Sequence, residues 1–385
     1  MKEIKVGLNV KFPASVQKAH SIVMEQKEHP PECIKYGWAT PKNLNNEGVY
    51  FHPKRQDFDL LEASDNPFLT SNRWIYSLAT VEFALNLKFN QVYYQRQKRI
   101  EIIRKIFSKD SLKKIIFFSK TGLESLSAYA GITDKKIIEK SVYLYNAVPD
   151  IRQDLINKKK KDKDKFRILF IGTAFYLKGG ASLVDAFEIL QKKYPFIELE
   201  LHSSLMKEGY LDNELYQPLH HEKTIQQIKN NPSIFNYNSF DVSRQKILQE
   251  VYPRADLFIL PSLQEGMPYV IQEAMSYGLP IISTNCTPSI PEIVEEGKNG
   301  LIINIQGRLF EKLKDMKDNK GKMQISKEFQ AYLTKEIVEN ISTLISDNKL
   351  ADKIRINNLK KSKDLFSFKN RNKQLRNIYE EAYHD

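Results

Sequence analysis

Two glutamates flank a short stretch of the sequence that could hold a phosphorylated sugar. Glu265 and Glu273 are separated by seven residues in PSLQEGMPYVIQEAMSYGLPIIST. Pro268 lies between them and suits the first position of a helix, where its missing N–H is not needed. The free amides and the dipole of a helix N-terminus favour negative charge. The spacing therefore predicts a diphosphate held by amides, with a carboxylate on either side to accept hydrogen bonds from sugar hydroxyls.

A second group of candidate residues lies in FIGTAFYLKGG, residues 170–180. Gly172 would let the backbone of a turn approach a phosphate closely. Lys178, followed by Gly179, could place an ammonium group beside the same phosphate. A cation at this point would offset the charge that develops on a leaving diphosphate, an effect of several kcal/mol where water is excluded.

The elements around these residues are typical of a doubly wound α/β domain. Helical spacing of apolar residues predicts helices at 181–190 and 268–278, and Gly278 suits the position that ends the second one. Ligands of open parallel sheets bind at the carboxyl ends of the strands, where the loop of Glu265 would lie. Short apolar runs predict buried strands at 167–172, 197–203, 255–262 and 279–284.

The first half of the chain is expected to form another Rossmann-like domain. A helix is predicted at 121–131, closed by Gly131, and a charged run from Lys158 to Lys165 is interpreted as an exposed linker. Strands are predicted at 2–10, 73–81, 113–119 and 141–149. The predicted division is an N-terminal domain at 1–155, a linker at 156–165, a C-terminal domain at 166–365, and a terminal helix at 366–385 that could pack back on the first domain.

Together these motifs resemble the E-x7-E pattern of family-4 retaining glycosyltransferases (glycosyl transferases group 1), which have the GT-B fold. The similarity runs from about residue 166 to residue 303 and includes PEIVEEGKNGLII at its end. The resemblance implies two Rossmann-like domains facing across a cleft. It also implies metal-independent transfer of a hexosyl unit from a nucleoside diphosphate sugar to a glycan, lipid-linked or other acceptor, with retention of configuration.

The resemblance also assigns roles to individual residues. Glu265 would contact the donor hexose, and Glu273 would bind the donor ribose. The amides of Gly266, Met267 and Tyr269, on either side of Pro268, would face the sugar and the phosphates. The nucleotide-binding segment of the family is expected near residues 235–244, where the match is loose.

One position departs from the family pattern. The family has an Arg just after the first glycine of the turn and a Lys before a later glycine. Lys178 matches the Lys, but Thr173 stands where the Arg would be. Phosphate stabilisation would then depend on Lys178, the amides and an Arg from elsewhere. In the first domain, Glu82 after the strand that ends at Val81 is the candidate for orienting the acceptor.

No metal and no cofactor are expected, because the sugar nucleotide is a substrate and Lys178 with a helix N-terminus can hold its phosphates. Two Asp-x-Asp tripeptides, at 57–59 and 162–164, could in principle hold a divalent cation. The second lies within the lysine run, and the first has no supporting helix after it. Both are interpreted as coincidence.

Length and composition fit this interpretation. The 385 residues suit two domains, and 41% hydrophobic residues argue against disorder. Two cysteines make a disulfide framework improbable and favour a reducing compartment. A cytoplasmic protein is expected, because no apolar run is long enough to span a membrane and the N-terminus lacks the pattern of a signal peptide. The net charge of +12 could bring it to anionic lipids at the inner membrane face; no nucleic-acid motif is present.

Two other functions stay open. Thr173 would also suit a non-catalytic relative that binds a sugar nucleotide or a glycan as a partner subunit. A sugar-nucleotide epimerase on the same fold would convert the donor without any acceptor.

Overall fold

The computed structural model places the chain in two compact units. One unit contains Met1–Ala147 together with Leu365–Asp385, and the other contains Val148–Asp364. The first boundary therefore lies before residue 148, ahead of the linker that the sequence predicts. The structure describes residues 3–8, 30–38, 41–44, 51–53, 57–64, 67–68, 70–81, 96–149, 164–205, 216–217, 220–238, 241–305 and 323–385.

The first unit is built on a parallel six-stranded sheet with the order β2-β1-β5-β6-β7-β8. A small antiparallel pair, β3 (Pro41–Leu44) and β4 (Phe51–Pro53), lies outside it. The six strands are β1 (Ile4–Leu8), β2 (Ile34–Trp38), β5 (Leu60–Ala63), β6 (Trp74–Leu78), β7 (Leu112–Phe117) and β8 (Ser141–Tyr143).

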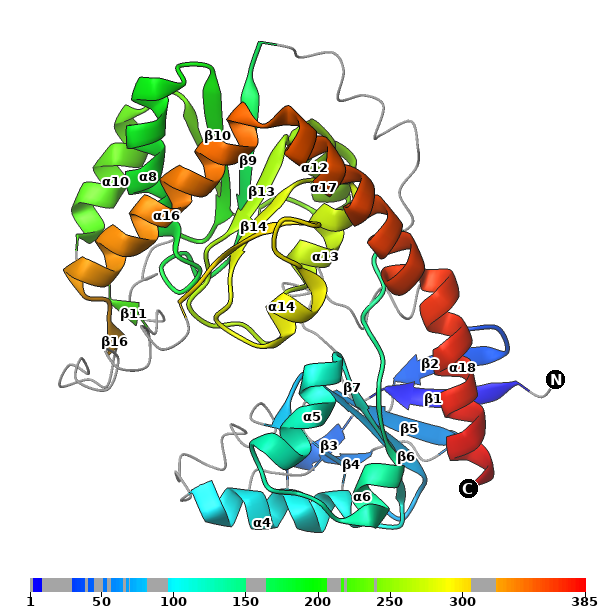
Figure 1. The fold of residues 1–385 in the computed structure, drawn as a ribbon. Helices are drawn as coiled ribbons and strands as arrows, with labels where there is room; N and C mark the ends of the chain where they lie inside the picture. Colours follow the sequence, from blue (N-terminus) through cyan, green and yellow to red (C-terminus); the bar gives the residue numbers. More distant parts are fainter. Residues whose placement is uncertain are drawn as a thin grey trace. The chain divides into compact units, whose positions relative to one another are not determined.

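Alternating side chains of these strands build two separate cores, one on each face of the sheet. Figure 1 shows helices on both sides of this sheet. Trp74 and Tyr76 of β6 belong to the core that is covered by α4 (Arg96–Phe107), α5 (Lys120–Ala128) and α6 (Lys135–Glu139). Ile75, between them, belongs to the core that is covered by α18 (Phe368–His384). The last helix of the chain is therefore part of the first unit.

A buried carboxylate ties α18 to the sheet. Glu62, at the end of β5, accepts hydrogen bonds from Ser77 Oγ at 2.6 Å and from Tyr379 Oη at 2.5 Å. Glu62 and Tyr379 are both buried. A buried carboxylate needs such donors because burial without them costs several kcal/mol. The charged residue in LLEA also explains why the sequence does not reveal β5 as a buried strand.

The second unit has a parallel sheet with the order β12-β10-β9-β13-β14-β15. The strand order reverses between β9 and β13, and ligands of open sheets bind at such a switch point, outside the carboxyl ends of the strands. The strands are β9 (Phe166–Ile171), β10 (Ile197–Ser203), β12 (Ile234–Asn238), β13 (Leu257–Leu260), β14 (Ile281–Thr284) and β15 (Leu301–Ile303).

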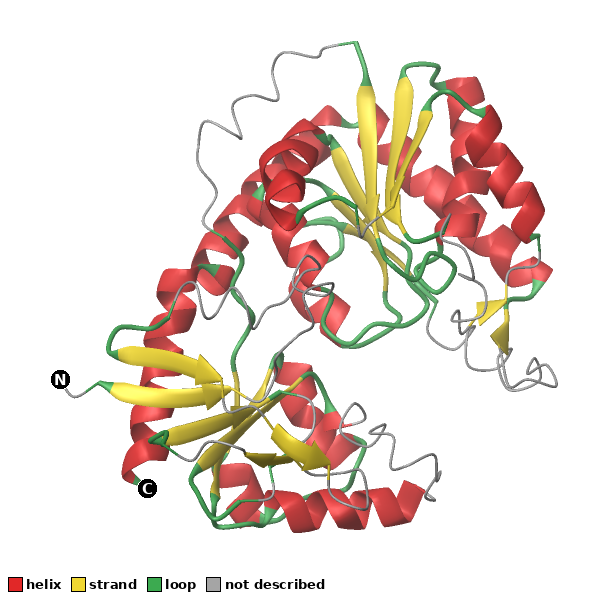
Figure 2. Ribbon diagram, turned by 180° about the vertical axis from the view of Figure 1, so that it is seen from behind, coloured by secondary structure: helices red, strands yellow, loops and turns green. Residues whose placement is uncertain are grey.

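Helices cover both faces of this second sheet (Figure 2). The helix α16 packs on α8 and reaches β14 and β15, and α13 packs on β13, β14 and α17. The longer helices are α8 (Gly180–Lys193), α10 (His221–Asn230), α13 (Tyr269–Ser276), α16 (Lys327–Ser346) and α17 (Asn348–Lys361). The shorter elements are α11 (Arg244–Lys246), a π-helical turn (Ile247–Val251), α12 (Tyr252–Arg254), α14 (Ser289–Ile293), the strand pair β11 (Tyr216–Gln217) and β16 (Met323–Gln324), and a second π-helical turn (Ser362–Phe366).

Two parallel sheets, each layered with helices, confirm the predicted pair of Rossmann-like domains. Gly278 follows the α13 cap with φ of 64°, as the predicted helix end requires. The prediction for Gly131 was wrong in detail. Helix α5 ends at Ala128 with Tyr129 as its cap, and Gly131, with φ of 60°, lies two residues beyond that cap.

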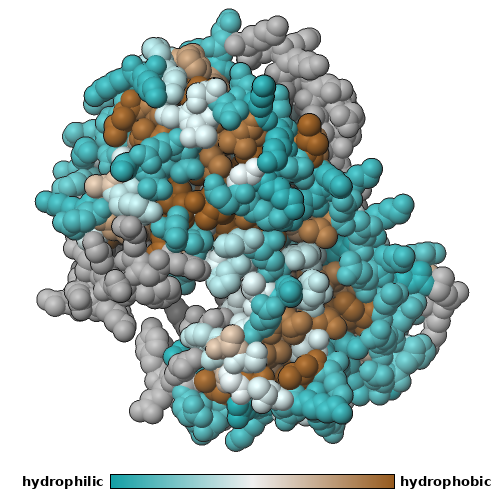
Figure 3. All heavy atoms as spheres, in the orientation of Figure 1, coloured by the Kyte–Doolittle hydropathy of each residue, from teal (hydrophilic) through white to brown (hydrophobic). Residues whose placement is uncertain are grey.

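The described residues include no candidate for a membrane-spanning helix. None of the described helices is both long and apolar enough to cross a bilayer. On the face drawn in Figure 3, hydrophilic side chains surround smaller hydrophobic areas in each unit.

We expect the Tyr379→Phe substitution to destabilise the first unit by about 1–3 kcal/mol, because it leaves the buried Glu62 carboxylate with one donor fewer. Both tryptophans of the chain, Trp38 and Trp74, lie in this unit. Urea unfolding followed by tryptophan fluorescence therefore reports on it directly.

Glu381→Gln is the matched control for this helix. Glu381 pairs with Lys114 at 2.5 Å, but its side chain is 60% exposed. Such a pair contributes less than about 1 kcal/mol. An equal loss of stability in the two variants would show that Glu62 does not anchor α18.

Candidate active site

The turn after β9 is pressed against the end of β13. Gly179 has φ of 77°, and a Cβ atom there would lie 2.1 Å from the carbonyl oxygen of Pro261. Only glycine tolerates both the left-handed backbone and this close approach. The amide of Leu263 donates to the carbonyl of Leu177 at 2.9 Å and holds the two segments together.

This close approach brings two of the predicted residues together. Lys178 Nζ lies 2.7 Å from Glu265 Oε1 and donates a hydrogen bond to the carbonyl of Gln264 at 2.9 Å. The two side chains are 20% and 10% exposed, so the pair is mostly buried but still reaches solvent. Gly172 lies beneath the lysine, since a Cβ there would be 3.0 Å from Lys178 Cγ. The pair sits at the switch point of the sheet.

A thiol that the motifs do not include borders this pair. Cys286 follows β14, two residues after Thr284. Burial, with a further contribution from the nearby Glu265 carboxylate, raises the pKa of the Cys286 thiol to about 12. The thiol is therefore protonated at neutral pH and can line the site, but it is a poor nucleophile there. The only feature of the sequence that could have predicted Cys286 near the site is its position just after a predicted strand.

The helix that follows Glu265 begins one residue later than predicted. Pro268 has φ of −72° and ψ of 102°, so it is the N-cap of α13 and not its first helical residue. Its carbonyl accepts from the amide of Ile271 at 3.1 Å. Ser289 Oγ donates to the carbonyl of Gly266 and fixes the loop before the cap. The backbone from Gly266 through Met267 to Tyr269 thus leads into a helix N-terminus, where first-turn amides have no intrahelical acceptor.

The second glutamate lies in a separate buried cluster. Glu273 is fully buried, and its Oε2 accepts from Tyr252 Oη at 2.7 Å. Its Oε1 forms an ion pair with Arg244 of α11. Burial, together with the Glu273 carboxylate, raises the pKa of Tyr252 well above its usual range, so this phenol acts as a donor. Tyr277 stacks on Tyr252 with ring centroids 5.1 Å apart.

Arg244 connects this cluster to the start of α13. Its guanidinium lies 5.2 Å from the centroid of the Tyr269 ring and donates to Tyr269 Oη at 3.3 Å. Arg244 is the last residue of the segment in which the sequence places the nucleotide site. The motifs alone could not select it, because the segment matches the family loosely.

The remaining candidates are scattered. Thr173 is exposed, and its carbonyl accepts from the amide of Ser204 at 3.3 Å. Glu82 lies outside the described residues. Asp59 of the first Asp-x-Asp tripeptide accepts from the amide of Lys5 at 2.8 Å. Within the described part of the chain, no three His, Cys, Asp or Glu side chains are grouped to hold a metal ion.

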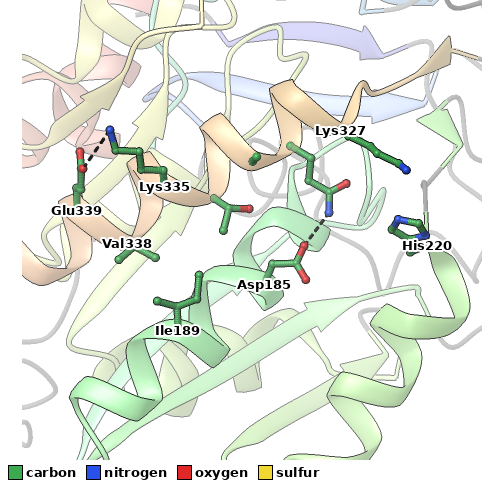
Figure 4. Close-up of a pocket in the computed structure, with 10 residues that line it drawn as sticks. Asp185, Ile189, His220, Lys327, Lys335, Val338 and Glu339 are labelled. Atoms are coloured by element: carbon green, nitrogen blue, oxygen red, sulfur yellow. Dashed lines mark hydrogen bonds and ion pairs between the residues drawn. The ribbon is translucent and has the colours of Figure 1, made fainter.

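A cavity of about 550 Å³ lies elsewhere in the second unit, between α8 and α16 (Figure 4). Asp185 of α8 accepts a hydrogen bond from Gln330 of α16 at its centre, at 2.7 Å, and His220 and Lys327 lie at one end. None of the predicted donor-site residues lines this cavity. The candidate site is therefore defined by the switch-point residues and not by this cavity.

Known proteins resemble this chain both in the sequence of its second unit and in its fold. Residues 151–329 match the family model described as glycosyl transferases group 1. An uncharacterized glycosyltransferase of Haemophilus influenzae is 33% identical over 146 residues, which cover 38% of this chain and 37% of that protein. The capsular polysaccharide biosynthesis glycosyltransferase CapM of Staphylococcus aureus is 24% identical over 357 residues, covering 85% and 83%. The chain spans little more than a third of the length of the first relatives that it matches.

Solved structures share the fold at low sequence identity. Anabaena HepE in complex with UDP-glucose is 16% identical, with a TM-score of 0.63 over 98% of this chain and 100% of that one. Sucrose-phosphate synthase from Thermosynechococcus elongatus is 14% identical, with a TM-score of 0.58 over 85% and 74%. Residues 151–329 therefore match the family model of glycosyl transferases group 1, and the chain shares the GT-B fold of these solved structures.

Proposed function

We propose that the chain transfers a hexosyl unit from a nucleoside diphosphate sugar to an acceptor hydroxyl, with retention of configuration and without a metal. The observation that carries the proposal is the pair of Lys178 and Glu265, 2.7 Å apart at the switch point of the second sheet. It lies beside the loop that leads to the N-terminus of α13. A cation, a carboxylate and helix amides are the groups that a sugar diphosphate needs.

In this proposal the donor diphosphate lies over Gly172 and against the amides of Gly266, Met267 and Tyr269. The bond from the sugar C1 to the diphosphate oxygen breaks, and the acceptor oxygen bonds to C1 on the same face. The acceptor proton passes to the leaving diphosphate, so atoms and charge balance. Lys178 offsets the negative charge that grows on that diphosphate.

The ion pair explains how both side chains become available when the donor binds. Without donor, Lys178 satisfies Glu265 in a mostly buried setting, where an unpaired charge would be costly. A diphosphate carries more negative charge than one carboxylate, so it attracts the ammonium more strongly. Glu265 is then free to accept hydrogen bonds from the hydroxyls of the sugar.

We propose a glycan or a lipid-linked sugar as the acceptor, in line with the name of the Staphylococcus aureus relative, a capsular polysaccharide biosynthesis glycosyltransferase. Glu82 stays the candidate for orienting that acceptor. A cytoplasmic protein that meets the inner membrane face would fit such a substrate. Positive charge is concentrated in the first unit, since residues 96–140 hold twelve Lys and Arg against five Asp and Glu.

The Lys178→Ala variant should lower kcat for donor turnover by about 100- to 1,000-fold, as expected when one group that stabilises the transition state is removed. The measurement is release of nucleoside diphosphate from UDP-glucose, or from the GDP- or ADP-hexose that the protein turns over. Lys298→Ala is the control, because Lys298 also pairs with a glutamate in this unit but is 61% exposed. Equal activity of the two variants would remove Lys178 from the mechanism.

The exposed Thr173 gives a second candidate, a non-catalytic protein that binds a sugar nucleotide or glycan. Glu265→Ala separates the two functions, because it should abolish donor turnover and the glycan product in cells if the chain is an enzyme. An unchanged cellular glycan would favour the binding role. Isomerised donor formed without any acceptor would instead identify an epimerase.

Membrane contact predicts that the protein sediments with vesicles of phosphatidylcholine and phosphatidylglycerol at low salt and is released at high salt. Replacing the exposed Lys98 and Lys105 of α4 with Gln should reduce the bound fraction. The same change at the exposed Lys349 and Lys353 of α17 should have less effect. Binding that is no greater than to pure phosphatidylcholine would refute the membrane proposal.

A further inference from the structure

We propose that the first unit binds a small oxyanion, a phosphate or carboxylate group, at the start of α18, with Arg371 as the residue that pairs with it. The inference goes beyond the proposed function, because it concerns the first unit and none of the residues assigned to the donor. It starts from a buried cation that has no counter-ion among the described residues.

Arg371 is that cation. The residue is 4% exposed, and its Nε and Nη1 have no hydrogen-bond partner within the described part of the chain. A guanidinium stays protonated in proteins and carries five N–H donors. Buried charges are normally paired, because an isolated charge is strongly unfavourable away from water. A bound anion would supply the partner, and phosphate and carboxylate are the groups that fit the guanidinium fork.

Helix geometry places this cation near the beginning of α18. Leu375, Tyr379 and Ala382 follow Arg371 at helical spacing and pack in the core that α18 covers. Arg371 continues the same stripe about one turn closer to the start of the helix. Side chains of a helix lean toward its N-terminus, so the Arg371 side chain leans toward the first turn of α18.

The first turn of α18 itself favours an anion. Ser367 is the N-cap, and its Oγ accepts from the amide of Asn370 at 3.4 Å. The other amides of a first helical turn have no acceptor within the helix. They add to the helix dipole, which favours negative charge at this end. The buried guanidinium and the helix N-terminus therefore favour the same kind of ligand.

The start of α18 lies at the carboxyl edge of the first sheet. The opposite end of the helix lies at the amino end of β7, because Lys113 Nζ donates to the carbonyl of Asp385 at 3.2 Å. Figure 1 shows the C-terminus on the side of the unit where β1 begins. The ring of Phe366, just before the N-cap, packs on Tyr145, which follows β8, with centroids 5.5 Å apart. Ligands of open parallel sheets bind outside the carboxyl ends of the strands.

A second buried polar group lies at this edge. Asn146 directly follows Tyr145 and is 1% exposed. Neither its Nδ2 nor its Oδ1 has a hydrogen-bond partner among the residues that the structure describes. A carboxamide can donate to an oxyanion through Nδ2 and accept from a hydroxyl through Oδ1. Asn146 therefore favours an anion that also carries hydroxyl groups, such as a sugar phosphate.

The test is thermal unfolding of the full chain followed by tryptophan fluorescence, since both tryptophans lie in the first unit. An anion that binds only the folded state raises the melting temperature by mass action. The probes are inorganic phosphate, glucose 1-phosphate and acetate, each titrated in the millimolar range at constant ionic strength. Phosphate also stabilises proteins by exclusion from their surface, but that effect grows with concentration and does not saturate.

In the unchanged protein, phosphate or glucose 1-phosphate should raise the melting temperature by about 5 °C at saturation. Arg371→Met should abolish this shift. Without any anion, the same variant should melt at a higher temperature than the unchanged protein, because it removes an unpaired buried charge. Arg371→Lys should keep part of the shift, because lysine retains the charge without the fork.

Arg376→Met is the matched control on the same helix. Arg376 already pairs with Glu32 and with Glu380, each at 3.0 Å. Its substitution should leave the anion-induced shift unchanged. A loss of the shift in this variant equal to that in Arg371→Met would mean that the general positive charge of α18, and not a site at Arg371, attracts the anion.

Two further results would overturn the inference. One is the absence of a saturable shift with all three anions in the unchanged protein. The other is a shift that Arg371→Met retains in full. If Arg371→Met does not fold, Arg371→Lys and calorimetric titration of the unchanged protein with phosphate decide instead. Donor binding is measured with UDP in the second unit, so a negative result here leaves the proposed function unaffected.

The comparison of probes tests the part of Asn146. Tighter binding of glucose 1-phosphate than of inorganic phosphate would support a contact between Asn146 and a ligand hydroxyl. Equal affinities would remove Asn146 from the site.

Discussion

The candidate site depends on how closely the turn after β9 approaches the end of β13. A Cβ at Gly179 would come within 2.1 Å of the Pro261 carbonyl, so this contact admits no other residue without movement of one strand end. Because the two segments touch there, Lys178 from one and Glu265 from the other form an ion pair across the switch point. The sheet order places this contact where the chain reverses direction across the sheet. The close approach at Gly179 is therefore what places Lys178 beside Glu265 at the switch point.

Charge is arranged around α13 in two layers. Lys178 and Arg244 reach solvent, while their partners Glu265 and Glu273 are the more buried members of the two pairs. A site built in this way is neutral when empty, which avoids the cost of isolated buried cations. In the proposed function, the ammonium group of Lys178 would still attract an incoming diphosphate. The protonated thiol of Cys286 adds no charge of its own to this surface.

The second unit was largely predictable because its signals are local. Short apolar runs predicted β9, β13 and β14, and the prediction for β10 matches the observed Ile197–Ser203. The helices α16 and α17 were missed, because the sequence around them carries no motif. The start of helix α13 was predicted within one residue and its end within two, and the error at Pro268 reflects a residue that suits a cap as well as a first turn.

The first unit was harder to predict from the sequence, because one strand of its sheet contains a buried charged residue. Glu62 interrupts the short strand β5, and its partner Tyr379 lies more than three hundred residues away in the chain. No local pattern can reveal such a pair. The same limit applied to Arg244, which reaches Glu273 from another segment of the fold. The spacing of residues in the sequence can reveal functional groups that share one helix, strand or loop. Contacts between different elements can be identified only once the fold is known.

If the donor diphosphate binds at the switch point, it must draw the ammonium group of Lys178 away from Glu265. A crystal structure of the protein with bound UDP would test it most directly. We expect a phosphate oxygen within hydrogen-bond distance of Lys178 Nζ, with the ion pair to Glu265 opened. A diphosphate bound in the cavity between α8 and α16, or a Lys178 that still contacts Glu265 alone, would contradict it.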